Sequence, residues 1–222
     1  MNILITRPLI DAEDLMGKLF SLGHKIIHIP TLKISSIKIE PLDASQYDAF
    51  IFTSANAIRN LNITKQDKGK LCFCVGAITE KIARKLGYNN TVSAGGTVNA
   101  LKNLIISSDQ ISQNSKIAYF CGDNISYDLD LELKREGLKV DKTINYKSEK
   151  INDLNDENKK IIISHPPDII FVYSVRSAQS FITIIKNYSL HPLMTGSKVM
   201  CISNKVLSEF KRSGWKRLEI FE

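Results

Sequence analysis

Six short turns carry the residues of this chain that are best suited to chemistry, and most of these residues are hydroxyl, amide or glycine residues. Each turn follows an apolar run that is typical of a buried strand. The turns are Thr6-Arg7-Pro8, Thr53-Ser54-Ala55-Asn56, Gly76-Ala77-Ile78-Thr79, Gly122-Asp123-Asn124, Tyr173-Ser174-Val175-Arg176 and Ser203-Asn204. Residues of these types cap the following helix and expose backbone N–H groups at its N-terminus, where carboxylates and phosphates bind. One such turn indicates capping alone, whereas six in two matching sets predict a polar, anion-binding cleft.

The common catalytic and nucleotide-binding motifs do not occur in this sequence. It contains no GxGxxG turn, no GxxxxGK(S/T) phosphate loop and no GxSxG elbow. The four histidines lie away from the six turns, so Ser-His or Cys-His catalysis has no assembled partners. The cysteines, Cys72, Cys74, Cys121 and Cys201, lack zinc-ligand spacing and are predicted to be buried thiols. We therefore expect no metal and no cofactor, and the residues alone predict no strong catalytic group.

The chain contains two copies of one three-part plan, and the copies occur in permuted order. Each part is an apolar run, a small polar turn and a helix-like stretch. The matching parts begin at Ile3 and Ile117, at Asp48 and Asp168, and at Val75 and Ile202, with offsets of 114, 120 and 127 residues. A repeat of this kind predicts two similar lobes with a ligand-binding cleft between them.

Short runs rich in Ile, Val and Phe predict buried strands, and amphipathic stretches between them predict helices. Strands are expected at 2–6, 25–29, 49–53, 71–75, 116–121, 168–173, 198–202 and 218–221. Helices are expected at 10–22, 55–64, 77–86, 97–107, 126–136, 176–187 and 203–213, and loops at 65–70 and 152–160. Gly23, Gly87, Gly137 and Gly214 each follow a predicted helix and suit a left-handed cap. This alternation predicts an α/β fold with parallel sheets covered on both faces.

Two segments differ from the rest, because they alternate polar and apolar residues and do not lead directly into a helix. Residues 31–39 and 143–150 are predicted to form an exposed, two-stranded antiparallel ladder. The ladder would join a discontinuous lobe of residues 1–30 and 151–222 to a second lobe of residues 40–142. Each lobe then holds one copy of each repeated part, which explains the permuted order.

The net charge of +7 favours an anionic partner. The basic pairs lie late in predicted helices, where they suit the helix dipole, and do not form the stripe expected of a nucleic-acid-binding protein. No apolar run approaches the ~20 residues needed to span a bilayer, and no leader is recognised. We expect a cytoplasmic monomer that binds a small polyanion, without nucleic acid or membrane. A non-catalytic, two-lobed binding module and a nucleic-acid-binding protein, the latter suggested by charge alone, remain alternatives.

The same residues resemble the uroporphyrinogen-III synthase family over essentially the whole chain. The matching segments are Ile5-Thr6-Arg7-Pro8, Phe52-Thr53-Ser54-Ala55-Asn56-Ala57, Val75-Gly76-Ala77-Ile78-Thr79, the Gly122…Gly137 spacing that leads to Asn145-Tyr146-Lys147, and Tyr173-Ser174. The resemblance implies two flavodoxin-like lobes joined by a two-stranded antiparallel ladder. It also implies a cofactor-free lyase of haem biosynthesis that cyclises hydroxymethylbilane to uroporphyrinogen III. That reaction expels water and inverts the last pyrrole ring, and its substrate is a tetrapyrrole with many carboxylates.

The resemblance also implies roles for individual residues. Tyr146 matches the family's acid, which would help the hydroxyl group leave, and a tyrosine is also an ordinary ladder residue. The expected substrate-binding residues are Thr6, Arg7, Thr53, Ser54, Ala55, Gly76, Thr79, Gly122, Tyr173, Ser174 and Ser203. Helix capping is the alternative role of Thr53, Ser54 and Thr79, and the two roles are compatible. Ser126 stands where many members carry an arginine, so carboxylates are expected to bind mainly to backbone N–H groups and helix N-termini.

Overall fold

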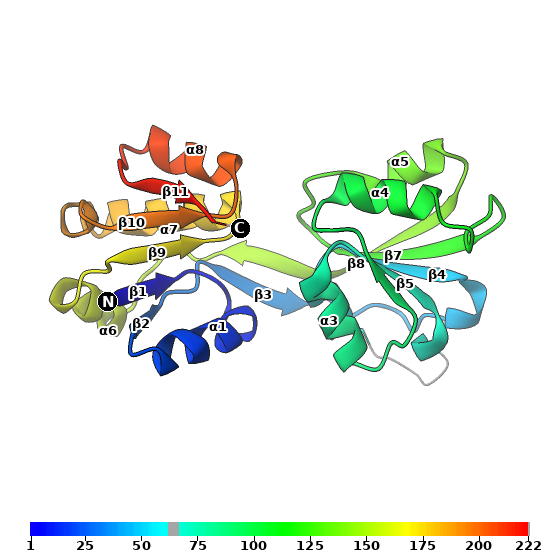
Figure 1. Cartoon of the computed structure of the whole chain (residues 1–222), viewed down its shortest axis with the longest axis horizontal. Helices are drawn as coiled ribbons and strands as arrows, with labels where there is room; N and C mark the ends of the chain where they lie inside the picture. Colours follow the sequence, from blue (N-terminus) through cyan, green and yellow to red (C-terminus); the bar gives the residue numbers. More distant parts are fainter. Residues whose placement is uncertain (62–66, 222) are drawn as a thin grey trace. The chain divides into compact units, whose positions relative to one another are not determined.

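Strands alternate with helices along most of the described chain, as the sequence pattern predicts (Figure 1). The computed structural model describes residues 1–61 and 67–221. The chain divides into a first unit, made of residues 1–33 and 149–222, and a second unit, made of residues 34–148. None of the described helices has the length and apolar character needed to cross a membrane.

The first unit is a five-stranded parallel sheet with helices on both faces. Its strands are β1 (Asn2–Ile5), β2 (Lys25–His28), β9 (Ile169–Val172), β10 (Lys198–Cys201) and β11 (Leu218–Ile220). Its helices are α1 (Leu9–Ser21), α6 (Asp156–Ser164), α7 (Val175–Asn187) and α8 (Asn204–Arg212). The strand order β2-β1-β9-β10-β11 is the flavodoxin-like order.

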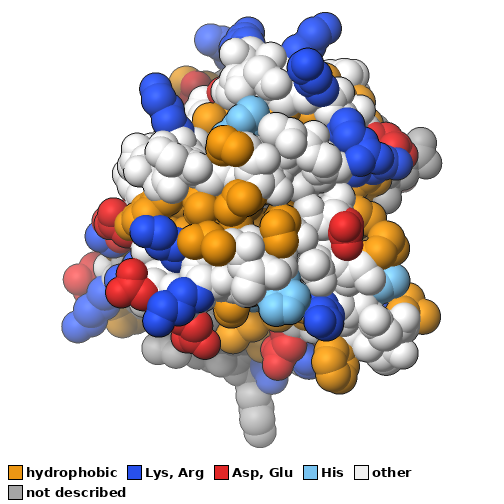
Figure 2. Space-filling model, turned by 90° about the vertical axis from the view of Figure 1, so that its left-hand side faces the viewer, with side chains coloured by type: hydrophobic (Ala, Val, Ile, Leu, Met, Phe, Trp, Pro, Cys, Tyr) orange, Lys and Arg blue, Asp and Glu red, His pale blue; other side chains and the backbone are white. Residues whose placement is uncertain are grey.

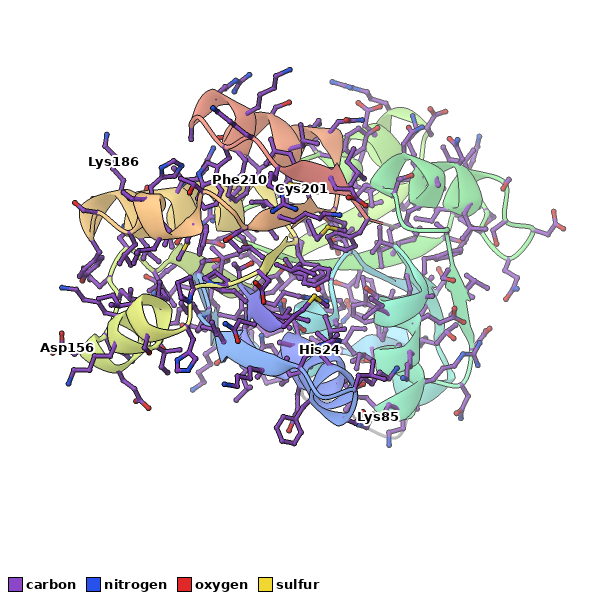
Figure 3. The ribbon with its side chains drawn as sticks, turned by 60° about the vertical axis from the view of Figure 1, so that its left-hand side comes forward. His24, Lys85, Asp156, Lys186, Cys201 and Phe210 are labelled. Atoms are coloured by element: carbon purple, nitrogen blue, oxygen red, sulfur yellow. The ribbon has the colours of Figure 1, made fainter. Side chains whose placement is uncertain are left out.

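The core of the first unit follows from the alternation of side chains along each strand. Ile3 and Ile5 pack against α1, and Leu4 packs on the opposite face with the residues of α7 and α8. Phe210 of α8 and Cys201 of β10 point into this interior, whereas Lys186 extends away from it (Figure 3).

The second unit is a six-stranded sheet. Its strands are β3 (Leu32–Ser36), β4 (Ala49–Phe52), β5 (Leu71–Cys74), β6 (Thr91–Ser93), β7 (Lys116–Gly122) and β8 (Lys139–Lys150). Its helices are α2 (Ala55–Arg59), α3 (Ala77–Lys85), α4 (Val98–Ile106) and α5 (Leu129–Arg135). The order is β3-β8-β7-β4-β5-β6, and β3 runs antiparallel to β8. Helices α4 and α5 cover one face, and α2 and α3 cover the other.

Strand pairing has the same register in both units, and the offsets of the sequence repeat account for it. Adding 114 to the paired residues Asn2 and Lys25 of β1 and β2 gives Lys116 and Lys139, which pair in β7 and β8. The other strand pairs correspond in the same way when the three offsets are applied to their residue numbers. The β1–β9 pair matches β7–β4, the β9–β10 pair matches β4–β5, and the β10–β11 pair matches β5–β6. The repeat is therefore a property of the fold, down to individual pairs of residues.

The four predicted caps are also confirmed. Gly23, Gly87, Gly137 and Gly214 have φ angles of 82°, 98°, 88° and 85°, in the left-handed region that favours glycine. They reverse the chain after α1, α3, α5 and α8.

One predicted loop is wrong, because residues 152–160 contain the start of helix α6. The Asn155 side chain accepts a hydrogen bond from the Asn158 N–H at 2.8 Å and so caps this helix. Two acidic residues, Asp156 and Glu157, occupy its first turn, where they suit the helix dipole. Ile162 is its only buried residue, and such a narrow apolar face gave little periodicity.

The ladder segments also differ from their predicted bounds. Strand β8 begins at Lys139, pairs in parallel with β7, and continues through the segment predicted as 143–150. Strand β3 is shorter than predicted, and the three-residue strand β6 was not predicted. Helix α2 ends at Arg59, so the helix predicted over 55–64 is shorter in its described part. Residues 62–64 of that helix and 65–66 of the following predicted loop lie outside the described residues.

Candidate functional site

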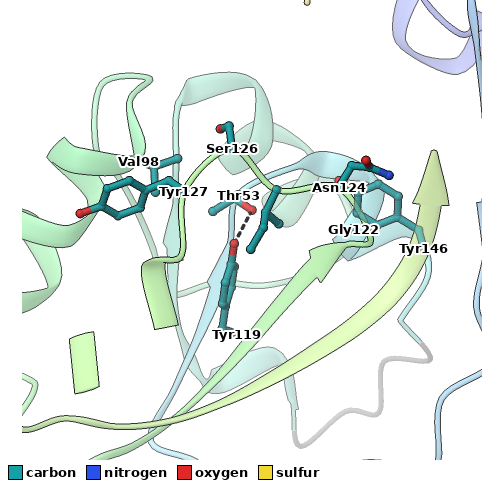
Figure 4. Close-up of a pocket in the computed structure, with 9 residues that line it drawn as sticks. Thr53, Val98, Tyr119, Gly122, Asn124, Ser126, Tyr127 and Tyr146 are labelled. Atoms are coloured by element: carbon teal, nitrogen blue, oxygen red, sulfur yellow. Dashed lines mark hydrogen bonds between the residues drawn. The ribbon is translucent and has the colours of Figure 1, made fainter. Parts of the chain in front are cut away.

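A hollow lies at the carboxyl edge of the second unit's sheet, where β4 and β7 end (Figure 4). Its volume is about 430 Å³, part of which is open to solvent. The lining residues are Thr53, Val98, Tyr119, Gly122, Asn124, Ile125, Ser126, Tyr127 and Tyr146. Three residues predicted from the sequence, Thr53, Gly122 and Tyr146, thus come together from three strands. Ligands of open parallel sheets bind at this edge.

The ring of Tyr146 lies so close to Gly122 that a side chain at position 122 would collide with it. A Cβ atom on Gly122 would lie 2.6 Å from Cζ, 2.7 Å from Cε2 and 2.9 Å from the hydroxyl oxygen of Tyr146. Carbon atoms in ordinary contact are about 3.5–4.0 Å apart. A side chain at position 122 would therefore displace the phenol ring, so glycine allows the Tyr146 ring to lie where it does.

A β-bulge brings Tyr146 to this position. Cys121 pairs with Ile144, but the next residue, Gly122, pairs with Tyr146, so β8 contains one extra residue, Asn145. Asn145 is fully buried, and its Nδ2 atom donates to the Ala57 carbonyl of α2 at 2.6 Å. Without the bulge Asn145 would pair with Gly122, so the bulge decides which side chain reaches the hollow.

A second phenol lies below the hollow, on the opposite face of the sheet from α2. Tyr119 of β7 is 1% exposed, and its hydroxyl lies 3.3 Å from Thr53 Oγ1, within hydrogen-bond distance. Figure 4 shows the Tyr119 hydroxyl pointing up to Thr53. Burial raises the pKa of Tyr119, so this phenol keeps its proton at neutral pH.

Four other predicted site residues of the second unit do not line the hollow. Ser54 caps α2, since its Oγ atom accepts a hydrogen bond from the Asn56 N–H at 3.2 Å. Gly76 precedes α3, and a Cβ atom there would lie 3.1 Å from the Cα atom of Gly96. Ala55 and Thr79 are nearly buried, with 8% and 6% exposed.

The remaining predicted residues lie at the carboxyl edge of the first unit's own sheet. Thr6 is fully buried and donates its hydroxyl hydrogen to the Phe171 carbonyl at 2.9 Å. The guanidinium of Arg7 lies over the ring of Tyr173, 4.6 Å from its centre. Burial raises the pKa of Tyr173, and the neighbouring Arg7 acts in the opposite direction. Thr6 thus serves the sheet itself, whereas Arg7 and Tyr173 form a cation–π pair.

Ser174 and Ser203 cap the helices that follow β9 and β10. Ser174 Oγ accepts from the Ser177 N–H at 3.0 Å, and Ser203 Oγ accepts from the Val206 N–H at 3.5 Å. The capping alternative raised by the sequence is therefore observed for Ser54, Ser174 and Ser203.

The hollow can offer neutral hydrogen-bond donors to a ligand. Its lining, as far as the chain is described, has three phenols, two hydroxyls and an amide, and no side chain that is charged at neutral pH. In the described part of the chain, no group of three or more His, Cys, Asp or Glu residues could hold a metal ion. The arrangement suits weak acid catalysis and the orientation of a ligand.

Sequence reasoning missed Tyr119 and Tyr127 as lining residues, whereas Asn124 belongs to one of the six predicted turns. Tyr119 lies inside an apolar run that was interpreted as a buried strand, and this is where it is found. A tyrosine in such a run is a usable signal, because a buried phenol needs a partner for its hydroxyl.

Comparisons with known proteins agree on one family. A family model described as uroporphyrinogen-III synthase HemD matches residues 13–220. A search of curated proteins finds no match. The structure is similar to the crystal structure of a uroporphyrinogen-III synthetase from Helicobacter pylori, with a TM-score of 0.63 and 15% sequence identity, over 99% of this chain and 91% of that one. It is also similar to a mutant uroporphyrinogen III synthase from Thermus thermophilus, with a TM-score of 0.56 and 13% identity, over 100% of this chain and 92% of that one.

Proposed function

Because this chain belongs to the uroporphyrinogen-III synthase family, which acts in haem biosynthesis, we propose that it converts hydroxymethylbilane to uroporphyrinogen III. The reaction closes the linear tetrapyrrole, expels water and inverts the last pyrrole ring. The observation that carries the proposal is the phenol of Tyr146, held against Gly122 at the edge of a hollow lined by uncharged side chains.

Tyr146 is the proposed acid for the departure of the hydroxyl group. Its phenol donates a proton to the leaving oxygen as the C–O bond breaks, so the oxygen departs as water. The resulting electrophilic carbon is attacked by the substituted carbon of the last pyrrole, which gives a spiro intermediate. Reopening and reclosure of that intermediate invert the ring, and the proton lost on closure restores the phenol. One positioned acid supplies typically 10²–10⁴-fold of rate.

Orientation carries the rest of the proposed catalysis. Hydroxymethylbilane loses its hydroxyl readily and cyclises unaided to the other isomer, so the protein must hold one geometry and exclude direct closure. The net charge of +7 attracts a polycarboxylate, and the serine-capped turns present backbone N–H groups that can bind its carboxylates.

The decisive experiment is an isomer assay. Freshly prepared hydroxymethylbilane is incubated with the protein, the products are oxidised, and the type I and type III uroporphyrins are separated and quantified. The proposal predicts mainly type III product, and the same incubation without protein gives type I. If the type I fraction stays unchanged at high protein concentration while a porphyrin still binds, the chain is a binding module.

A further inference from the structure

The two units share one register, so each paired residue of the five equivalent strands has a counterpart in the other unit. Tyr119 of β7 corresponds to Ile5 of β1, at the offset of 114 residues. Ile5 is fully buried among Ile3, Ala12 and other apolar side chains. The fold therefore accepts a plain aliphatic residue at this position, and packing alone does not require the Tyr119 hydroxyl.

Thr53, the partner of Tyr119, is likewise replaced by a different residue in the first unit. Thr53 corresponds to Tyr173 at the offset of 120 residues, so the Thr53–Tyr119 pair of the second unit is matched by Tyr173 and Ile5 in the first. A hydrogen bond between the two hydroxyl groups is thus possible only in the second unit, which holds the hollow and Tyr146. A buried hydroxyl without a partner is costly, and the Tyr119 hydroxyl lies against Thr53 and against the Cys121 thiol of its own strand.

We propose that Tyr119 is a positioning residue, which orients the Thr53 hydroxyl to bind a carboxylate oxygen of the substrate. Either hydroxyl could donate in this contact. In the proposed arrangement the Tyr119 phenol, the stronger acid of the two, donates to Thr53 Oγ1. Thr53 then keeps its own hydrogen for a ligand in the hollow, which both residues line. The identity of the ligand rests on the proposed function.

The geometry explains why a tyrosine at this position reaches Thr53. Tyr119 pairs with Ile51 in the β4–β7 ladder, and Thr53 follows Ile51 by two residues on the same face. Side chains in strands stand roughly perpendicular to the sheet and lean along the strand, and diagonal neighbours lie within reach of a long aromatic side chain. Phenylalanine at 119 would fill nearly the same space, and neither phenylalanine nor isoleucine would present a donor to Thr53.

The test is a double-mutant cycle read in KM and kcat. A carboxylate contact made equally in the ground and transition states appears in KM, with kcat unchanged. Tyr119→Phe is expected to raise KM about threefold to tenfold, as for the loss of one neutral hydrogen bond. Thr53→Val should raise KM at least as much, and the double variant should match Thr53→Val within about twofold, because Tyr119 acts only through Thr53. If Tyr119→Phe does not fold, Tyr119→Ile takes its place in the cycle. Isoleucine is the residue at the equivalent position of the first unit, Ile5.

The matched control is Tyr47→Phe. This variant also removes a tyrosine hydroxyl from the second unit. The Tyr47 hydroxyl donates to Asp141 at 3.0 Å, and neither residue lines the hollow. Its KM should stay at the wild-type value. An unchanged KM in Tyr119→Phe, or additive effects in the cycle, would overturn the inference.

A second measurement separates this inference from the proposed function. Uroporphyrin III, the oxidised form of the proposed product, is titrated against each variant by fluorescence quenching. If wild-type protein makes no type III product but binds uroporphyrin III, the proposed reaction fails, and weaker binding by Tyr119→Phe still supports the positioning role. A wild-type chain that neither forms type III product nor binds uroporphyrin III would overturn both.

Discussion

The contact between Gly122 and Tyr146 predicts a large loss of activity from a single added methyl group. In Gly122→Ala, the new Cβ atom would lie 2.6 Å from Cζ of Tyr146, about 0.9 Å closer than ordinary contact allows. The ring of Tyr146 must therefore move by nearly that much. A displacement of about 1 Å at a reacting group can cost on the order of 100-fold in rate, so we expect a loss in type III formation as large as, but no larger than, that of Tyr146→Phe.

The stability of Gly122→Ala should change little, which separates this effect from unfolding. Gly122 does not have a positive φ angle, and an alanine at such a position gains about 0.4–1 kcal/mol from the unfolded chain. The Tyr146 ring is only partly buried, and it is the far end of a side chain, which shifts more easily than backbone. We therefore expect Tm to stay within about 4 °C, the shift that corresponds to roughly 1 kcal/mol in a chain of this size.

The isomer assay and thermal unfolding measure the two quantities on the same samples. Gly196→Ala is the matched control, because its added Cβ atom meets no atom within 4 Å. If Gly122 acts through Tyr146, adding Gly122→Ala to Tyr146→Phe should lower activity little further. Wild-type type III formation by Gly122→Ala would refute the required position of the ring. If Gly122→Ala lowered activity equally in wild-type protein and in Tyr146→Phe, Gly122 would act by a route that does not involve the Tyr146 hydroxyl.

The remaining predictions concern the acid, the bulge and the caps. Tyr146→Phe should lower kcat about 10- to 100-fold with the fold retained, and full activity would remove Tyr146 from the role of acid. Asn145→Ala should cost about 1–3 kcal/mol in chemical denaturation, because it leaves the Ala57 carbonyl without its 2.6 Å hydrogen bond. Ser54→Ala and Thr79→Ala should each reduce activity only slightly, with a larger loss in combination, since helix-terminus contacts are worth ~0.3–1 kcal/mol each. Loss of all activity in Ser54→Ala at unchanged Tm would contradict recognition shared among many backbone groups.

Basic side chains do not gather into a stripe on the face of the molecule shown in Figure 2. Figure 2 shows one face of the molecule, on which Lys and Arg side chains are mixed with acidic and hydrophobic ones. Several basic residues are also paired, as in the contacts of Lys142 with Asp130 at 3.2 Å and of Lys198 with Glu219 at 2.8 Å. The excess of +7 therefore does not form a continuous stripe on this face.

Two local features were readable in the sequence but were missed. The Asn155 cap and the acidic first turn of α6 follow ordinary helix-start rules, but the polar composition of 152–160 favoured a loop. The beginning of β8 alternates exposed and buried residues from Lys139, and this pattern was recognised only from Thr143. Helix α6 and the beginning of β8 both expose many of their residues to solvent, so their sequences show only a weak hydrophobic periodicity.

The sequence by itself determined most of the strand and helix pattern, the glycine caps and the equivalence of the two units. Hydrophobic periodicity and caps are local properties, and the repeat carried the pairing of one unit over to the other. Only the tertiary structure decided which side chains meet in the hollow. The Thr53–Tyr119 contact joins residues 66 positions apart, and the Asn145–Ala57 hydrogen bond joins residues 88 positions apart. The extra residue in β8 depends on such pairing between distant segments, because a bulge has no periodic signature of its own, and it is the bulge that brings Tyr146 beside Gly122.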